Sequence, residues 1–154
     1  MKAIWPTDNQ YHMEVEIKIK YLKDAHHLEQ TEIGSWIDLY VYEDTAIKQG
    51  EQAYVNLGVA MELPQGYEAI LAPRSSTYKN WGLIQTNSIG VIDATYNGDN
   101  DIWKLPVKAT KSIVIPKDTR ICQFRIQKEQ PTIKFNVVDS LGNKDRNGFG
   151  STGE

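Results

Sequence analysis

The sequence predicts an all-β protein that forms one barrel-like or jelly-roll domain. Three observations support this fold class: apolar and polar residues alternate over several short stretches, turn-forming residues separate those stretches, and no long stretch repeats its apolar residues at helical spacing. Successive side chains of a strand leave opposite faces of a sheet, so alternation indicates a strand with one buried face. Many short strands at this spacing are typical of all-β barrels and jelly rolls. A chain of 154 residues has the size of one domain and can bury a core without disulfides.

The strands are predicted from two kinds of stretch. Apolar residues occupy every second position over residues 13–21, 55–63 and 133–137. Shorter apolar stretches, at residues 69–71, 113–115 and 121–126, are also typical of strands. Turn signals lie between them, at Gln49-Gly50, Pro64-Gln65-Gly66, Asn97-Gly98 and Pro116-Lys117-Asp118.

One short helix and two atypical ends complete the predicted organisation. Residues 75–81 are polar and are followed by Gly82, which favours a turn or two of helix. Residues 1–12 mix Pro6 with polar residues, and residues 141–154 are rich in glycine and poor in apolar side chains. We therefore expect a loose N-terminal extension over 1–12, a β domain over 13–140, and a flexible C-terminal arm over 141–154.

Composition excludes several classes of function. The chain has 17 Lys and Arg against 20 Asp and Glu, a net charge of −3, so a broad nucleic-acid or anionic membrane surface is not expected. The single cysteine, Cys122, excludes an intrachain disulfide and a cysteine-rich zinc site. No apolar run has the length of a membrane span, and residues 1–6 lack the apolar region of a signal peptide. We expect a cytoplasmic protein that binds neither membrane nor nucleic acid.

The glycine-rich end of the chain is a candidate phosphate-binding segment. Residues 148–153 match the pattern G-x-G-x-x-G, but the chain ends one residue later, so the strand–turn–helix context of a dinucleotide site is absent. Backbone N–H groups of such a segment can still bind phosphate oxygens. The alternative is a solvated terminus, although Phe149 is out of place in a tail that contacts nothing.

Arg74 begins a second candidate anion site. It lies between a predicted strand and the predicted helix, followed by Ser75 and Ser76. The N-terminus of a helix exposes unpaired N–H groups, and a guanidinium adds a bidentate donor for phosphate. The alternative is an ordinary helix start with a surface arginine.

Asp93 is the candidate general base. It follows the apolar residues Val91 and Ile92, and apolar surroundings raise the pKa of a carboxyl group toward the range of a general base. The alternative is an aspartate that opens the turn toward Asn97-Gly98. Nearby, Tyr96 is either a core or rim tyrosine or a flat platform for a ligand. Gln123 faces away from the core, where its amide binds a phosphate or satisfies a backbone group.

Together these segments resemble the homotrimeric dUTP diphosphatase (dUTPase) family, whose five motifs are matched in order over residues 36–153. The match is specific because the five motifs occur in register, although each alone is weak. The matching residues are Ile37-Asp38-Leu39, Pro73-Arg74-Ser75-Ser76, Gly90 to Asp99 preceded by Asn87, Arg120-Ile121-Cys122-Gln123, and Arg146 to Gly153. The stretch 100–105, with Trp103, resembles versions carried by phages of Gram-positive bacteria.

The resemblance implies a jelly-roll homotrimer that hydrolyses dUTP to dUMP and diphosphate, which limits dUTP and supplies dUMP for dTTP synthesis. It implies that Asp93 activates the water that attacks the α-phosphorus and that Tyr96 excludes a 2′-hydroxyl. Asn87, Gly90, Val91 and Ile92 are implied to read the uracil edge. The implied phosphate-binding residues are Arg74, Ser75, Ser76, Gln123, Arg146, Gly150, Ser151 and Thr152, with Phe149 as a lid over the base.

The resemblance also implies Mg²⁺, bound mainly by phosphate oxygens and water and reached by Asp38 only through water. Each site is implied to lie between subunits and to be closed by the arm of another subunit. If the chain is phage-encoded, it acts in the cytoplasm of the host cell. A regulatory protein partner of the kind that some dUTPases bind is not identified by the sequence.

Two other functions remain as alternatives for a protein of this fold. A dCTP deaminase shares the fold, but its chemistry needs a glutamate, and residues 91–96 contain none. A catalytically inactive trimer that serves as a binding or regulatory protein has no need of Asp93, Arg146 and Phe149 together.

Overall fold

Antiparallel strands make up nearly all the regular structure of the protein, which we describe from a computed structural model over residues 14–150. The strands are β1 (Lys18–Tyr21), β2 (Ile37–Tyr40), β3 (Thr45–Ile47), β4 (Gln52–Asn56), β5 (Val59–Glu62), β6 (Tyr67–Pro73), β7 (Leu83–Gln85), β8 (Gly90–Ile92), β9 (Lys104–Ala109), β10 (Ile113–Ile115) and β11 (Arg120–Lys128). One helix, α2 (Ser75–Trp81), follows β6. The predicted all-β class is therefore confirmed, and the predicted extension over 1–12 lies outside the described residues.

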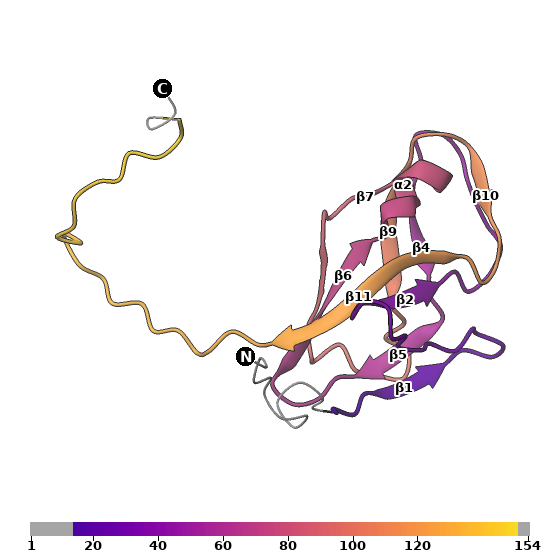
Figure 1. The fold of residues 1–154 in the computed structure, drawn as a ribbon, viewed down its shortest axis with the longest axis horizontal. Helices are drawn as coiled ribbons and strands as arrows, with labels where there is room; N and C mark the ends of the chain where they lie inside the picture. The colour runs from indigo at the N-terminus through magenta and orange to yellow at the C-terminus, as the bar shows by residue number, and fades with distance from the viewer. Residues whose placement is uncertain (1–13, 151–154) are drawn as a thin grey trace, which may run out of the picture.

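The strands form four sheets in the described part of the chain, and their pairings do not close into one barrel. The largest sheet has the order β2-β11-β6-β8, and a second has the order β4-β9-β7. Two hairpin-sized sheets, β1-β5 and β10-β3, complete the body (Figure 1). Strand β11 lies inside the largest sheet, between β2 and β6, and its register shifts between Arg120 and Cys122.

The core lies between these sheets and depends on the alternation seen in the sequence. Trp103 and Phe124 are both buried and pack edge to face, with ring centroids 5.1 Å apart. Aromatic pairs favour this geometry because the positive edge of one ring meets the negative face of the other. Cys122 is fully buried among apolar residues, and this burial raises the pKa of its thiol.

The predicted strand over residues 55–63 is instead two strands, β4 and β5. Gly58 separates them with a φ of +70°, a backbone conformation that residues with a side chain rarely adopt. The alternation nevertheless predicted burial correctly, because Val55, Leu57, Val59, Met61 and Leu63 all belong to the core.

The predicted helix over residues 75–81 is confirmed as α2. Gly82 ends it with a φ of +63°, and its N–H donates to the carbonyl of Tyr78. Thr77 ties the helix to the largest sheet, since its buried hydroxyl donates to the carbonyl of Ile121 on β11 at 2.7 Å. The end of β6 and the start of α2 are therefore held against β11.

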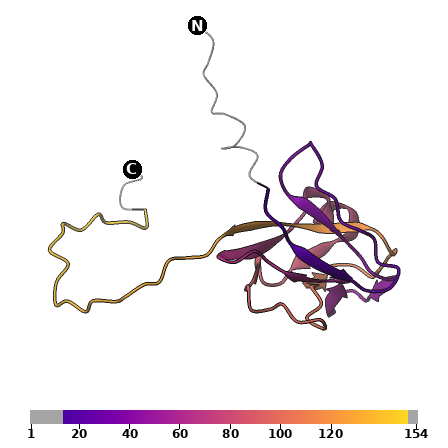
Figure 2. The same cartoon turned by 90° about the horizontal axis from the view of Figure 1, so that it is seen from below.

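The predicted strand over residues 133–137 is wrong for the single chain. Regular pairing ends at Lys128, and the chain then runs away from the body as an extended segment that leads into the arm (Figures 1 and 2). Phe135 and Val137 are 87% and 93% exposed. A strand needs a neighbour for its backbone groups and a cover for its apolar face, and this part of the chain has left the sheets that would supply them.

Candidate active site

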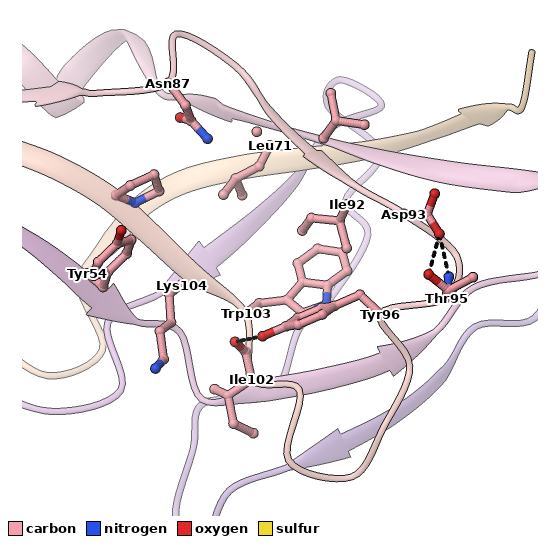
Figure 3. A pocket seen from close by; sticks show the side chains of 13 residues that line it. Tyr54, Leu71, Asn87, Ile92, Asp93, Thr95, Tyr96, Ile102, Trp103 and Lys104 are labelled. Carbon is pink, nitrogen blue, oxygen red and sulfur yellow. Dashed lines mark hydrogen bonds between the residues drawn. The ribbon is translucent and has the colours of Figure 1, made fainter.

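A pocket of about 550 Å³ lies where β8 and the loop after it meet the sheet of β4 and β9. Its volume is in the range of small-molecule sites. Strand β6 contributes Leu71, β4 contributes the exposed Tyr54, and β9 contributes Lys104. The remaining lining residues are Asn87, Gly90, Val91, Ile92, Asp93, Thr95, Tyr96, Ile102, Trp103 and Pro106 (Figure 3).

Asp93 lies at the rim of this pocket, directly after β8. Its Oδ1 accepts two hydrogen bonds from Thr95, from the backbone N–H at 2.7 Å and from the hydroxyl at 2.6 Å (Figure 3). These bonds stabilise the carboxylate and hold the pKa of Asp93 below its ordinary value. The expected raised pKa is therefore wrong, because the side chain is exposed rather than enclosed by Val91 and Ile92.

Tyr96 is fixed across the pocket by its own hydroxyl. The hydroxyl donates to the backbone carbonyl of Ile102 at 3.0 Å, and the backbone N–H of Tyr96 donates to the carbonyl of Asp93. The ring is 42% exposed, so it is a rim tyrosine that presents a surface to the pocket. The hydroxyl and the backbone N–H of Tyr96 are therefore both hydrogen-bonded in the absence of a ligand.

The loop and strand from Asn87 to Ile92 form one wall of the pocket. Gly90 pairs with Leu71 across β6 and β8, and a Cβ atom on Gly90 would lie 3.0 Å from the Cβ of Leu71. That approach is tighter than ordinary van der Waals contact, so glycine allows the wall to sit close to β6. Val91 is 60% exposed beside it.

A second cluster gathers Asp38 on β2, Arg120 on β11, and Arg74 at the junction of β6 and α2. Arg74 Nε lies 3.0 Å from Asp38 Oδ1, and Arg120 Nη1 lies 3.9 Å from Asp38 Oδ2. Arg74 Nη1 also donates to the backbone carbonyl of Arg120 at 3.2 Å. Asp38 therefore orients Arg74.

Gln123 and the two serines surround this cluster. Gln123 faces Asp38 across β11 and β2, and its Nε2 donates to the carbonyl of Pro73 at 3.1 Å. Ser76 lies within 3.5 Å of Arg74 Nη1, and Ser75 is exposed at the start of α2. Pro73 and Arg74 line a separate hollow with Leu83 and Ser88, so one chain does not join this cluster and Asp93 in one pocket.

The candidate residues of the arm lie far from both clusters in the single chain. Arg146, Phe149 and Gly150 are exposed, and they belong to the segment, yellow in Figure 2, that runs well away from the body. Ser151 and Thr152 lie outside the described residues. A single chain thus forms the pocket around Asp93 and the cluster around Arg74, but it does not bring the arm to either of them.

Sequence reasoning missed several residues of the pocket. Thr95 holds the catalytic candidate, and the pattern Asp-x-Thr is a local signal for this kind of bond. Tyr54 and Lys104 come from β4 and β9, and only the fold brings them into the pocket that Asp93 also lines. No local signal identifies them.

Two further findings concern metals and membranes. Among residues 14–150, no group of three or more His, Cys, Asp or Glu side chains is arranged to hold a metal ion. No helix in the same part of the chain has the length and apolar character needed to cross a membrane.

Comparisons with known proteins identify the family. The dUTPase family model matches residues 26–153. The SPbeta prophage-derived deoxyuridine 5′-triphosphate nucleotidohydrolase YosS of Bacillus subtilis is 57% identical over 140 residues, which cover 90% of this chain and 99% of that protein. The deoxyuridine 5′-triphosphate nucleotidohydrolase of Clostridium tetani is 33% identical and covers 92% of this chain and 99% of its own length.

Solved structures agree in fold. The dUTPase of Staphylococcus bacteriophage 80alpha, solved with dUPNHPP, superposes with a TM-score of 0.75 at 22% identity over 90% of this chain and 99% of its own. A mutant dUTPase from phage phi11 of S. aureus, described with a structural Mg(II) ion, superposes with a TM-score of 0.71 at 18% identity over 82% of this chain and 99% of its own. The family model, the relatives and the fold agree: the chain belongs to the dUTPase family.

Proposed function

We propose that the protein hydrolyses dUTP to dUMP and diphosphate. The observation that carries the proposal is the pocket that combines the ionised carboxylate of Asp93, the fixed ring of Tyr96 and the amide of Asn87. A carboxylate, an aromatic platform and an amide are the groups needed to activate water, hold a sugar and read a pyrimidine. Family membership and the pocket support the same substrate.

Asp93 acts as the general base. It accepts a proton from a water molecule whose oxygen attacks the α-phosphorus, and the bond from that phosphorus to the bridging oxygen of the β-phosphate breaks as diphosphate leaves. The low pKa of Asp93 keeps it deprotonated at neutral pH, so its contribution rests on positioning the water rather than on high basicity.

The pocket walls select the nucleoside. Asn87 and the backbone from Gly90 to Ile92 bind the edge of the uracil ring. The ring of Tyr96 packs against the deoxyribose and leaves no space for a 2′-hydroxyl. Its bond to Ile102 supports this role, because a ring that cannot swing away rejects a larger sugar more strongly.

The triphosphate is bound by donors from the second cluster and from the arm. Arg74, Ser75, Ser76 and Gln123 hold phosphate oxygens, and Asp38 keeps the guanidinium of Arg74 in place. Arg146, Gly150, Ser151 and Thr152 bind the distal phosphates while Phe149 covers the base. Closing the arm excludes bulk water, which strengthens these charged contacts.

Mg²⁺ is expected to bind together with the substrate rather than at a preformed protein site. The described carboxylates form no cluster for a metal, and Asp38 is already paired with two arginines, so phosphate oxygens and water would be the main ligands of the ion. When bound, it would neutralise charge on the triphosphate. Asp38 would reach it only through water.

The complete enzyme is a cytoplasmic jelly-roll homotrimer with sites between subunits. The separation of the Arg74 cluster from the pocket of Asp93 supports a site that two chains share. The exposed apolar residues between β11 and the arm support docking on a second copy, since Phe135 and Val137 need a cover that their own body does not give. The division into a 1–12 extension, a 13–140 domain and a 141–154 arm is part of this proposal.

Diphosphate release tests the proposal. Purified protein with Mg²⁺ is expected to release diphosphate from dUTP far faster than from dCTP, dTTP or UTP. Ammonia release from dCTP is measured in parallel, because it would identify a deaminase; no glutamate lines the pocket formed by the described residues, which does not favour that chemistry. Equal inactivity on all four nucleotides would overturn the proposal.

A further inference from the structure

Gln85, at the end of β7, is the one side-chain amide that is buried within residues 14–150. It is 7% exposed and lies behind the wall of the pocket, against Leu71 of β6. A buried amide loses its water and needs protein partners, so its bonds constrain the structure around it.

Both hydrogen bonds of the Gln85 side chain are donated by its amide nitrogen, Nε2. Nε2 donates to the backbone carbonyl of Leu71 at 3.1 Å and to Oδ1 of Asn87 at 2.9 Å. A backbone carbonyl only accepts, so turning the Gln85 amide over would bring two acceptors together at Leu71. The amide keeps its orientation although Oε1 is left buried without a partner among the described residues.

This orientation determines which end of Asn87 faces the pocket. Because Nε2 of Gln85 is a donor, the Asn87 atom beside it is the acceptor Oδ1, and the donor Nδ2 lies on the other side. Nδ2 is 3.5 Å from the position that a Cβ on Gly90 would occupy. Figure 3 shows the nitrogen of Asn87 on the side of Leu71, within the wall of the pocket.

We infer that Gln85 is a specificity-determining positioning residue: through Asn87, it makes the site select a pyrimidine with a keto group at C4 over one with an amino group. The inference rests on the proposed function, in which Asn87 contacts the base. A uracil O4 accepts from Nδ2, whereas a cytosine amino group would set two donors against each other. Gln85 itself does not touch the nucleotide.

The direct test is Gln85→Met, which keeps the unbranched shape and removes the donor. Without the Nε2 donor of Gln85, the Asn87 amide can present either its oxygen or its nitrogen to the base. We expect the ratio of kcat/KM for dUTP to kcat/KM for dCTP to fall at least tenfold, about 1.4 kcal/mol, with the KM for dUTP rising and its kcat changing less than about twofold. Gln127→Met is the matched control, because Gln127 Nε2 also donates to a side chain, Glu68, but on an exposed part of the sheet.

A double-mutant cycle separates positioning from a structural effect. In an Asn87→Asp background both side-chain oxygens are acceptors, so the orientation that Gln85 imposes no longer matters. Adding Gln85→Met there is expected to change the dUTP to dCTP ratio less than about twofold. A merely structural role predicts the same loss on both nucleotides in both backgrounds.

The possible results distinguish a failure of this inference from a failure of the proposed function. If Gln85→Met keeps the wild-type ratio while wild-type protein prefers dUTP, the inference is overturned and the proposed function stands. If wild-type protein does not hydrolyse dUTP, the proposed function fails first. Should Gln85→Met not fold, Gln85→Glu replaces it, since an ionised carboxylate accepts only and is expected to shift the ratio in the same direction; an unchanged ratio in that variant likewise overturns the inference.

Discussion

At the scale of single residues, two hydrogen bonds from Thr95 lower the pKa of Asp93 below its ordinary value. Both donors of Thr95 point at the same carboxylate oxygen, and both favour the ionised form. A base with a low pKa is present in its active form at every physiological pH. If Asp93 is the proposed general base, activity is lost as the pH falls through that low pKa, and the two bonds from Thr95 are expected to move the acid limb to lower pH.

Thr95→Val tests this dependence. The substitution removes the hydroxyl bond and keeps the backbone bond, so the pKa of Asp93 rises toward its ordinary value. We expect the acid limb of the kcat/KM profile for dUTP to move to higher pH, while activity at pH well above the limb changes little. Thr119→Val is the control, because its hydroxyl donates to Pro116 away from the pocket. An unmoved limb would show that Thr95 does not set the charge of Asp93.

Tyr96 sets sugar selection in this account. Tyr96→Ala removes the ring that fills the space of a 2′-hydroxyl, so the ratio of kcat/KM for UTP to kcat/KM for dUTP is expected to rise at least about tenfold. Tyr96→Phe keeps the ring and loses only the bond to Ile102, so a smaller rise is expected. Equal ratios in wild type and Tyr96→Ala would remove the ring from sugar selection.

At the scale of elements, the pairing of β2, β11 and β6 assembles the Arg74 cluster. Asp38 and Gln123 face each other because the register of β11 shifts between Arg120 and Cys122. The sequence predicts these strands from their apolar residues, but it cannot predict which strands pair or where a bulge falls, since both depend on contacts between distant segments. The resemblance implied that Asp38 reaches Mg²⁺ through water; the structure shows in addition that Asp38 pairs with Arg74.

Asp38→Asn tests whether Asp38 holds the guanidinium of Arg74 in place. Asp38 and Arg74 are only 26% and 30% exposed, so removing the carboxylate leaves Arg74 partly buried without its ionic partner. We expect the KM for dUTP to rise about three- to tenfold, as for the loss of roughly 1 kcal/mol of a charged contact. The Mg²⁺ concentration for half-maximal activity is expected to change much less. A rise confined to the Mg²⁺ requirement would instead place Asp38 on the metal.

At the scale of the whole molecule, the proposed site is divided between the body of the chain and an arm that lies away from it in the single chain. The alternation over residues 133–137 predicts a face that needs a cover, but a sequence does not say which chain provides it. In the single chain, Ile133 is 51% exposed and Phe149 has no cover at all. The strand prediction failed for this reason, and the same residues are available to a neighbour.

Complementation between two inactive variants tests whether two chains contribute residues to one active site. One protein ends after Asn143 and keeps Asp93; the other is full-length Asp93→Asn. Co-refolded mixtures are expected to regain dUTP hydrolysis, because each chain supplies what the other lacks across an interface. The truncated protein alone should keep the size of the wild-type assembly in light scattering. Mixtures as inactive as both parents would show that each arm serves its own chain.

Isotope-labelled water shows which phosphorus atom is attacked and whether Asp93 activates the attacking water. The protein is incubated with dUTP and Mg²⁺ in ¹⁸O-labelled water, and the products are analysed by mass spectrometry. Attack at the α-phosphorus by a water that Asp93 activates predicts label in dUMP, unlabelled diphosphate, and a loss of rate of about 10²–10⁴ in Asp93→Asn with nearly unchanged binding of dUMP. Label in the diphosphate, release of orthophosphate, or near-normal turnover by Asp93→Asn would contradict the account.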